Sequence, residues 1–509
     1  MQDPRPRLAG LVPVLAALKL GLHLFVNAGT AYGFQRDEFL YFAMGRHLQL
    51  WRMDFPPAIA LLAEAVRSTL GDSIVVLRLI PALAGTAVLV LAALTARELG
   101  GARWAQSLAA LGILTSPLFL RSSNLFQPVV LDQLAWTVAL YALARLCRDE
   151  RPRWWMLMGV ALGLGLLAKF SAGFIGLALL LALLITSRRA WLLTPWPWLA
   201  AGVALALGSP SIVGQIRLGF PVLGQMADLR ASQLERVTPA AYIGGQLRWG
   251  PAVLVGWIGL GMLLFGRRLR PFRVAGWTCA LAWLLLLALH GKPYYVGPIY
   301  PFLLGAGGVA LELVSRPRLG PIIRWTSAGL LVAYMGLTLP LGVPILPPER
   351  MARYARAMGL SAALRTNTGR LERLPEDYAD MLGWEEQVRA VARVYRSLAD
   401  AERAKAVIVG GNYGEAGALD FYGPRYGLPP AVCGSGSYWF FGPGTKPGEV
   451  LVTLGVDRDD LTRLYDDVRP AGHISSPWSV WYERDLTIYV ARGPHTTLQR
   501  LWPSLAGQN

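Results

Sequence analysis

The sequence predicts a polytopic α-helical membrane protein with a small α/β domain at its C-terminal end, and three observations carry this prediction. The chain of 509 residues is 54% hydrophobic and only 16% charged, which is too little charge to cover a soluble protein of this length. Its apolar residues come in blocks of roughly 20, the length that a membrane-spanning helix needs. From about residue 350 the composition becomes charged and turn-rich, without further blocks of this kind.

The first apolar block runs from Leu8 to Ala28 and follows Arg5 and Arg7. No small-residue cleavage site follows it cleanly, so we expect an uncleaved first span and not a removed signal peptide. Further single spans are expected at residues 74–97, 104–120, 128–146, 191–212, 249–266, 274–290, 294–314 and 325–346.

The stretch from Trp154 to Thr186 needs a separate explanation. It lies between two basic strings, is too long for one span, and contains the polar break Lys169-Phe170-Ser171. Two short helices that meet at this break satisfy all three facts and bring the count to about eleven. Lys169 then lies near the outer membrane surface, where a lysine is a functional-site candidate.

The formal net charge is +17, and its distribution argues against nucleic-acid binding. The excess is arginine in short strings between apolar blocks, which is typical of cytoplasmic loops. No basic recognition helix is present. If these loops are cytoplasmic, the first outer loop (residues 29–73) and the tail (residues 347–509) lie on the outer side of the inner membrane. Residues 1–346, which include that loop, form the multi-pass membrane domain. The three cysteines do not have a metal-ligand spacing.

The tail has the pattern of an extracytoplasmic α/β domain. Lys405–Val409 and Val450–Leu454 are expected to be buried strands, and Asp459–Val468 a helix. Val480–Ala491 alternates sufficiently for another strand.

The first outer loop contains the residues best suited to chemistry. It reads Phe34-Gln35-Arg36-Asp37-Glu38-Phe39-Leu40-Tyr41, then His47-Leu48, then Asp54-Phe55-Pro56-Pro57. An acidic pair directly after a span can direct a carboxylate into a cavity at the membrane surface. The alternative is a solvated loop in which Asp37 or Glu38 pairs with Arg36.

This string resembles the first-loop signature of the protein O-mannosyltransferase and aminoarabinose-transferase superfamily, whose bacterial members are C-type (GT-C) membrane glycosyltransferases similar to glycosyltransferase family 39. The resemblance extends in order over nearly the whole chain, through Arg78–Pro81, Leu131–Trp136, Gly165–Phe170, Gly291–Tyr295 and Gly411–Leu419. The family departs from this chain at Phe55, where aminoarabinose transferases usually have a lysine before the paired prolines. Lipid A and aminoarabinose therefore do not follow from the resemblance.

The resemblance implies a catalytic group of Asp37, Glu38 and Asp132. It makes Asp37 the base that deprotonates the acceptor, with Glu38 orienting Asp37 or binding the sugar. Asp132 would assist acceptor positioning or, in some branches, metal binding; a helix-terminal charge is its alternative. Lys169, Lys292 and Arg78 could hold the donor phosphate electrostatically. The alternative for both lysines is that they only extend to the lipid headgroups.

Interfacial aromatic and polar residues are expected to complete the site. Tyr294 and Tyr295 would bond phosphate or sugar, or only form an interfacial belt. His47, Tyr41 and Asp54 are the expected acceptor- or sugar-binding residues, although His47 could instead only cap the local structure.

The expected reaction is inverting transfer of a sugar from a polyprenyl-phosphate donor to a lipid, glycan or protein acceptor. No cofactor is certain from the sequence, and a divalent metal is an option. Two alternatives stay open: a flippase of lipid-linked sugars and an interaction protein of the cell envelope. Transporters usually have an internal repeat, which this sequence does not show.

Overall fold

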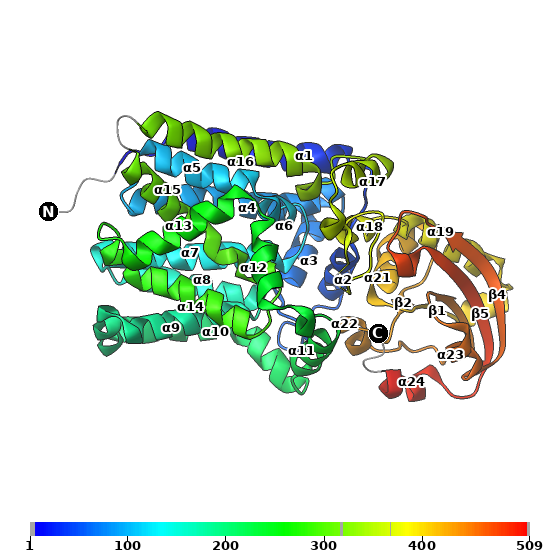
Figure 1. Ribbon diagram of the computed structural model, residues 1–509. Helices are drawn as coiled ribbons and strands as arrows, with labels where there is room; N and C mark the ends of the chain where they lie inside the picture. The colour runs from blue at the N-terminus through cyan, green and yellow to red at the C-terminus, as the bar shows by residue number, and fades with distance from the viewer. Residues whose placement is uncertain (1–5, 316–318, 367, 506–509) are drawn as a thin grey trace.

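The computed structural model describes residues 6–315, 319–366 and 368–505, and it consists of two parts (Figure 1). One part is a bundle of long helices, and the other is a β-sheet domain at the end far from the N-terminus. Two helices of the first outer loop, α2 (Arg36–Arg46) and α3 (Ala58–Leu70), lie where the parts meet. The fold thus places the acidic motif beside the tail.

All eleven segments predicted to span the membrane are helical. They are α1 (Leu11–Gly29), α4 (Ile74–Glu98), α5 (Arg103–Thr115), α7 (Pro128–Asp149), α8 (Arg153–Ala168), α9 (Ala172–Ile185), α10 (Pro195–Arg217), α13 (Pro251–Phe265), α14 (Arg273–Ala288), α15 (Tyr300–Val314) and α16 (Gly320–Gly342). Among the described residues, seven helices are long and apolar enough to cross a membrane, or up to nine if each of two bent pairs is one span. Helices α5 and α8, with 13 and 16 residues, fall outside that count. Length and composition therefore support at most nine of the eleven expected spans.

Shorter helices connect the long ones or lie at the end of the bundle nearer the tail. They are α6 (Pro117–Ser122), η1 (Ser187–Leu193), α11 (Pro221–Ser232), η2 (Leu234–Arg236), α12 (Pro239–Leu247), η3 (Arg270–Phe272), η4 (Pro293–Ile299), α17 (Pro348–Ala357), η5 (Ser361–Leu364) and α18 (Glu376–Ala379).

The break between α8 and α9 is where the sequence predicts it. Helix α8 ends at Ala168, and Lys169 is extended with φ −160° and ψ 140°. A Cβ on Gly165 would lie 2.9 Å from the Cβ of Ala172 and 3.1 Å from that of Ala135. A residue without a side chain is therefore needed for the close approach of α8, α9 and α7 beside the break.

The tail contains a five-stranded mixed sheet in the order β2-β1-β3-β5-β4. Its strands are β1 (Ala406–Gly410), β2 (Ala431–Val432), β3 (Val450–Leu454), β4 (Tyr465–Ser475) and β5 (Asp485–Pro494), and its helices are α19 (Trp384–Ser397), α20 (Asp400–Lys405), α21 (Tyr413–Tyr422), η6 (Gly423–Tyr426), α22 (Ser437–Phe441), α23 (Arg458–Thr462), η7 (Trp481–Glu483), α24 (Leu498–Leu501) and η8 (Trp502–Leu505). Strands β2, β1 and β3 are parallel, whereas β5 is antiparallel to β3 and β4. The predicted α/β tail is confirmed.

The two faces of the sheet belong to different hydrophobic cores. Ile408 of β1 faces a core shared with α2, α19 and α21, whereas Val407 faces a core with Leu461 and Trp502. This alternation follows from the period of two residues in a strand. The α2 helix therefore shares a core with the tail domain.

Two predictions for the tail are partly wrong. The helix expected at Asp459–Val468 ends at Thr462, and the edge strand β4 begins at Tyr465. The strand expected at Val480–Ala491 begins only at Asp485, because residues Trp481–Glu483 form a short helical turn. Acidic residues and Pro470 in β4 suit an edge strand, because they discourage pairing with another chain.

Candidate active site

Asp37 lies in the first turn of α2, and a capping box fixes that turn. The side chain of Gln35 accepts a hydrogen bond from the Asp37 N–H at 2.9 Å, and the Gln35 N–H donates to Glu38 Oε2 at 2.7 Å. A carboxylate at a helix N-terminus is stabilised by the helix dipole. The side chain of Asp37 stays about one-third exposed, at 31%, so it can meet a substrate.

Both oxygens of the Asp37 carboxylate have a hydrogen-bond donor. The hydroxyl of Tyr413 donates to Oδ1 at 2.9 Å, and Nε2 of Gln127 donates to Oδ2 at 3.3 Å. Arg36 Nε lies 3.8 Å from Oδ1. Burial and the charge of Asp37 raise the pKa of the Tyr413 phenol, so its hydroxyl remains a donor at neutral pH. Tyr413 and Gln127 were not singled out by the sequence analysis.

Glu38 points away from Asp37 into the protein. Its Oε1 and Oε2 accept from Nε and Nη2 of Arg78 at 3.0 and 2.6 Å, and neither side chain is exposed. The Phe126 N–H also donates to Glu38 Oε1, at 2.8 Å. Arg78 further donates to the side chain of Asn27 and the carbonyl of Gly33. These contacts give Glu38 and Arg78 a structural role, and those of Arg78 lend no support to the predicted phosphate binding.

Lys292 and Lys169 lie on the same side of the protein as Asp37. Lys292 directly precedes η4, and it interacts electrostatically with Asp37, Glu376 and Asp377 as well as with Lys169. Burial lowers the pKa of Lys292, whereas the three carboxylates raise it. The two lysines and Asp37 therefore form one group of charges.

The tyrosine pair lies against Lys169. The Lys169 ammonium lies 5.5 Å from the ring centroid of Tyr294 and 4.7 Å from that of Tyr295, within the range of cation–π attraction. The two rings meet edge to face, with centroids 4.7 Å apart. The structure thus brings together Lys169, Lys292 and both tyrosines, which the sequence predicted as donor-binding residues.

Asp132 lies on α7 close enough to Lys169 for their charges to interact. Its Oδ2 accepts from the hydroxyl of Ser171 at 2.8 Å, and its side chain is buried. Its Oδ1 has no hydrogen-bond partner among the described residues. Asp132 therefore bonds to Ser171 at the break between α8 and α9, and its charge lies near that of Lys169.

The three predicted acceptor residues separate into two places. Tyr41 follows Asp37 by one helical turn, so the two share a face of α2. The ring of His47 stacks on Phe441 at 4.2 Å, and buried Asp54 accepts from the hydroxyl of Ser437 at 2.8 Å. Burial raises the pKa of Asp54, and the hydrogen bond from Ser437 opposes this change. His47 and Asp54 therefore lie at the contact between the first outer loop and α22, and not beside Asp37.

A polar group from the tail surrounds Arg36. The Arg36 guanidinium lies 5.1 Å from the ring centroid of Tyr413 and 5.5 Å from that of Tyr482, and it donates to the Tyr482 hydroxyl. The same hydroxyl donates to Asp380 Oδ1 at 3.1 Å. Burial raises the pKa of Asp380 to about 7, although Arg36 opposes the shift. The sequence offered no signal for this group, since its members are far apart in the chain.

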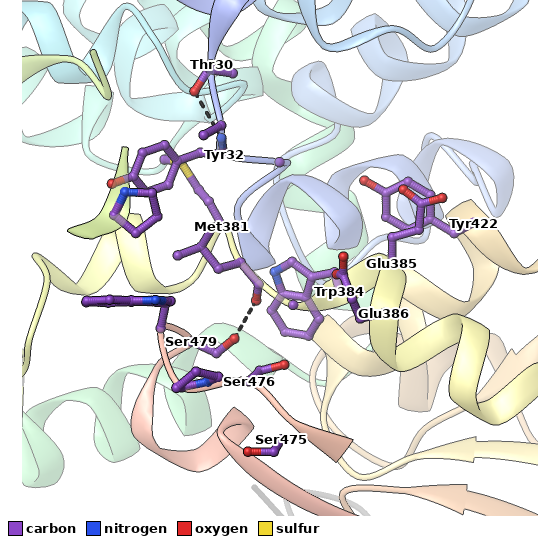
Figure 2. Close-up of a pocket in the computed structure, with 17 residues that line it drawn as sticks. Thr30, Tyr32, Met381, Trp384, Glu385, Glu386, Tyr422, Ser475, Ser476 and Ser479 are labelled. Atoms are coloured by element: carbon purple, nitrogen blue, oxygen red, sulfur yellow. Dashed lines mark hydrogen bonds between the residues drawn. The ribbon is translucent and has the colours of Figure 1, made fainter. Parts of the chain in front are cut away.

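A cavity of about 530 Å³ opens between the start of the first outer loop and the tail (Figure 2). Residues 30–33, 381–386 and 475–479 line it, together with Pro348 and Tyr422. Ser479 donates to the carbonyl of Leu382 at 2.8 Å across its wall. None of the predicted site residues lines this cavity.

Among the described residues, no group of three or more His, Cys, Asp and Glu side chains is placed to hold a metal ion. Metal participation therefore stays a prediction, and no step below is routed through a metal.

Comparisons with known proteins relate part of the sequence to a family and the whole fold to a solved structure. Residues 54–213 match the family described as dolichyl-phosphate-mannose-protein mannosyltransferase. No curated protein matches the sequence at a significant level. The fold is similar to that of ArnT from Cupriavidus metallidurans bound to undecaprenyl phosphate, with TM-score 0.61 and 15% identity over 94% of this chain and 98% of that chain. The apo form of ArnT gives TM-score 0.58 and 17% identity over 98% and 99%.

Proposed function

We propose that this chain is a membrane glycosyltransferase of the GT-C type, which moves a sugar from a polyprenyl-phosphate carrier to an acceptor hydroxyl with inversion at the anomeric carbon. One observation carries the proposal: Asp37, a partly exposed carboxylate with both oxygens held, interacts electrostatically with Lys292, which in turn interacts with Lys169 beside the tyrosine pair. The similarity to a protein bound to undecaprenyl phosphate supports the choice of donor.

The proton of the acceptor goes to Asp37. A hydroxyl is a poor nucleophile, and a positioned carboxylate raises the rate by about 10²–10⁴-fold as a general base. As the O–H bond breaks, the acceptor oxygen forms a bond to the anomeric carbon. The bond from that carbon to the phosphate oxygen breaks on the opposite side. A single displacement of this kind inverts the anomeric configuration.

The leaving group is the polyprenyl phosphate, which takes the electron pair of the broken bond. Its oxygens gain charge in the transition state, and fixed positive charges stabilise them. Lys292 and Lys169 supply this charge, and the hydroxyls of Tyr294 and Tyr295 can donate to the phosphate. Asp132 orients Lys169.

The first test is release of polyprenyl phosphate by purified protein from a panel of polyprenyl-phosphate sugars, with envelope extract as the source of acceptor. Asp37→Asn should lower turnover by about 10²–10⁴-fold and leave donor binding intact, because asparagine cannot take the proton. Asp72→Asn is the matched control, because Asp72 is in the same loop, 43% exposed, and pairs with Arg425 at 3.5 Å. Unchanged turnover in Asp37→Asn would remove Asp37 from the role of base.

The alternative function is a flippase of lipid-linked sugars. The same purified protein in vesicles would then move labelled lipid between leaflets without cleaving it. Lipid transfer without release of polyprenyl phosphate would reject the transferase proposal.

We place the site and the tail on the extracytoplasmic side of the inner membrane, because the arginine-rich loops lie at the other ends of the helices. The three native cysteines are buried. One introduced cysteine in an exposed position therefore reports its side of the membrane to an impermeant thiol reagent. Arg458→Cys in the tail should label in intact cells, and Arg268→Cys only after permeabilisation; the reverse result would invert the topology.

A further inference from the structure

We infer that Tyr413 of the tail domain is a positioning residue for Asp37, so that the tail completes the active site; this inference rests on the proposed function of Asp37 as the base. The Tyr413 hydroxyl donates to Asp37 Oδ1 at 2.9 Å although 376 positions separate the two residues in the chain. The contact therefore depends on how the tail packs on the first outer loop.

Two glycines of α21 allow that packing. A Cβ on Gly414 would lie 2.3 Å from Cγ of Arg36, and a Cβ on Gly417 would lie 2.6 Å from Cβ and 3.1 Å from the backbone carbon of Phe39. Real Cβ atoms essentially never approach as closely as 2.3 or 2.6 Å, so a side chain at Gly414 would displace the Arg36 side chain and one at Gly417 would push α21 away from Phe39 of α2. The close approach of these helices is what lets the Tyr413 hydroxyl reach Asp37.

The turn before α21 fixes the direction of Tyr413. Asn412 caps the helix, and its Oδ1 accepts from the N–H groups of Gly414 and Glu415 at 2.8 and 3.1 Å. Glu415 Oε2 in turn accepts from the N–H groups of Gly411 and Asn412 at 2.7 and 3.1 Å. Tyr413 is the first residue of α21, so hydrogen bonds to the residues before and after it fix its backbone. In this geometry the segment Gly411–Gly417 serves to direct Tyr413 toward Asp37.

Tyr413 acts on the reaction through Asp37. With Tyr413 on Oδ1 and Gln127 on Oδ2, the carboxylate cannot rotate freely about its terminal bond. A reacting group displaced by about 1 Å can lose on the order of 10²-fold in rate. Loss of the Tyr413 hydroxyl should thus lower kcat while leaving the binding of the lipid donor unaffected.

The chain offers a matched control for this change. Tyr438 is another buried tyrosine of the tail, and its hydroxyl donates to the carboxylate of Asp420 at 2.7 Å. Tyr438→Phe removes the same kind of hydrogen bond as Tyr413→Phe but does not touch Asp37. We expect Tyr413→Phe to lower kcat by about 10-fold or more with the donor KM within about twofold of wild type, and Tyr438→Phe to leave both constants within about twofold.

The packing argument has its own variant. Gly417→Ala keeps the Tyr413 hydroxyl but adds the Cβ that collides with Phe39. It should reproduce the fall in kcat of Tyr413→Phe. The control for strain within the tail is Gly427→Ser, because Gly427 has no atom near its Cβ position but has a φ of 74°.

The outcomes separate this inference from the proposed function. One outcome would overturn the inference but retain the proposed function. In that outcome the wild type releases polyprenyl phosphate, Asp37→Asn abolishes the release, and Tyr413→Phe leaves it unchanged. If the wild type releases no polyprenyl phosphate, the function fails, and the contact is tested by melting temperatures of Asp37→Ala, Tyr413→Phe and the double variant. Non-additive changes would support the contact, and additive changes would overturn it.

Discussion

The guanidinium of Arg78 holds both carboxylate oxygens of Glu38, at 3.0 and 2.6 Å, in a pair closed to solvent. This pair joins α4 to the first turn of α2, directly behind Asp37. A buried ion pair adds little net stability, but removal of one partner leaves an uncompensated charge and costs about 3–5 kcal/mol. The pair therefore fixes the position of α2, and with it the position of Asp37.

Arg78→Met should consequently act on stability before it acts on donor affinity. We expect a marked fall in the melting temperature of detergent-purified protein, because Glu38 loses its charge partner. The control is Arg463→Met, which removes an exposed pair with Asp460 (75% and 64% exposed) and should change stability by no more than about 0.5 kcal/mol. An Arg78→Met protein with normal melting and weakened lipid-phosphate binding would restore the original phosphate role of Arg78.

Lys292→Met and Lys169→Met should each weaken binding of free polyprenyl phosphate. A hydrogen bond to a charged group contributes roughly 1.5–3 kcal/mol, so the dissociation constant should rise by about 10–150-fold. The control is Lys405→Met in the tail, whose ammonium pairs with Glu449 at 2.6 Å, with side chains 57% and 47% exposed. Equal affinity in the lysine variants and the control would exclude both lysines from the phosphate site.

The membrane part of the fold could be predicted because apolar length and arginine placement are local signals. The break at Lys169 is the clearest case: two basic strings and one polar interruption were sufficient to predict α8 and α9. Strand β4 was not predictable in this way, since acidic residues at 466–467 suit a helix equally well. Its pairing with β5 comes from tertiary packing, which overrides local preference.

The residues of the site likewise separate into those that local sequence signals predict and those that only tertiary packing brings together. Asp37 and the two lysines stand beside recognisable motifs, and the structure brings them together. Arg78 was predicted to join a clamp of basic residues on the phosphate, and its actual partner, Glu38, lies 40 positions away in the chain. Tyr413, Tyr482 and Asp380 could not be predicted, because only the docking of the tail brings them to Arg36 and Asp37.

The last prediction concerns pH and the buried carboxyl pair beneath α21. Glu415 and Glu483 hydrogen-bond each other, and Glu483 also accepts from Asn412 and Gln387 at 2.8 and 3.0 Å. Burial raises the pKa of both groups, that of Glu483 to about 7, against roughly 4.3 for a glutamate in an unfolded chain. Between these values the folded state keeps a proton that the unfolded state releases. The contribution of the pair to the stability of the folded state is therefore fully present below a pH of about 4.3, and it is lost as the pH rises through about 7.

Glu415→Gln supplies this proton permanently, because its amide N–H₂ can donate to Glu483 while its oxygen still accepts from Gly411 and Asn412. The variant should melt like the wild type near pH 5 and at a higher temperature near pH 8. A gain of about 1 kcal/mol corresponds to roughly 2–4 °C for a domain of this size. Asp380, whose pKa is raised to about 7, also loses its contribution to stability as the pH rises. Part of the dependence of the melting temperature on pH therefore remains in both the wild type and the variant. An equal shift of the melting temperature at both pH values would show that the pair does not share a proton.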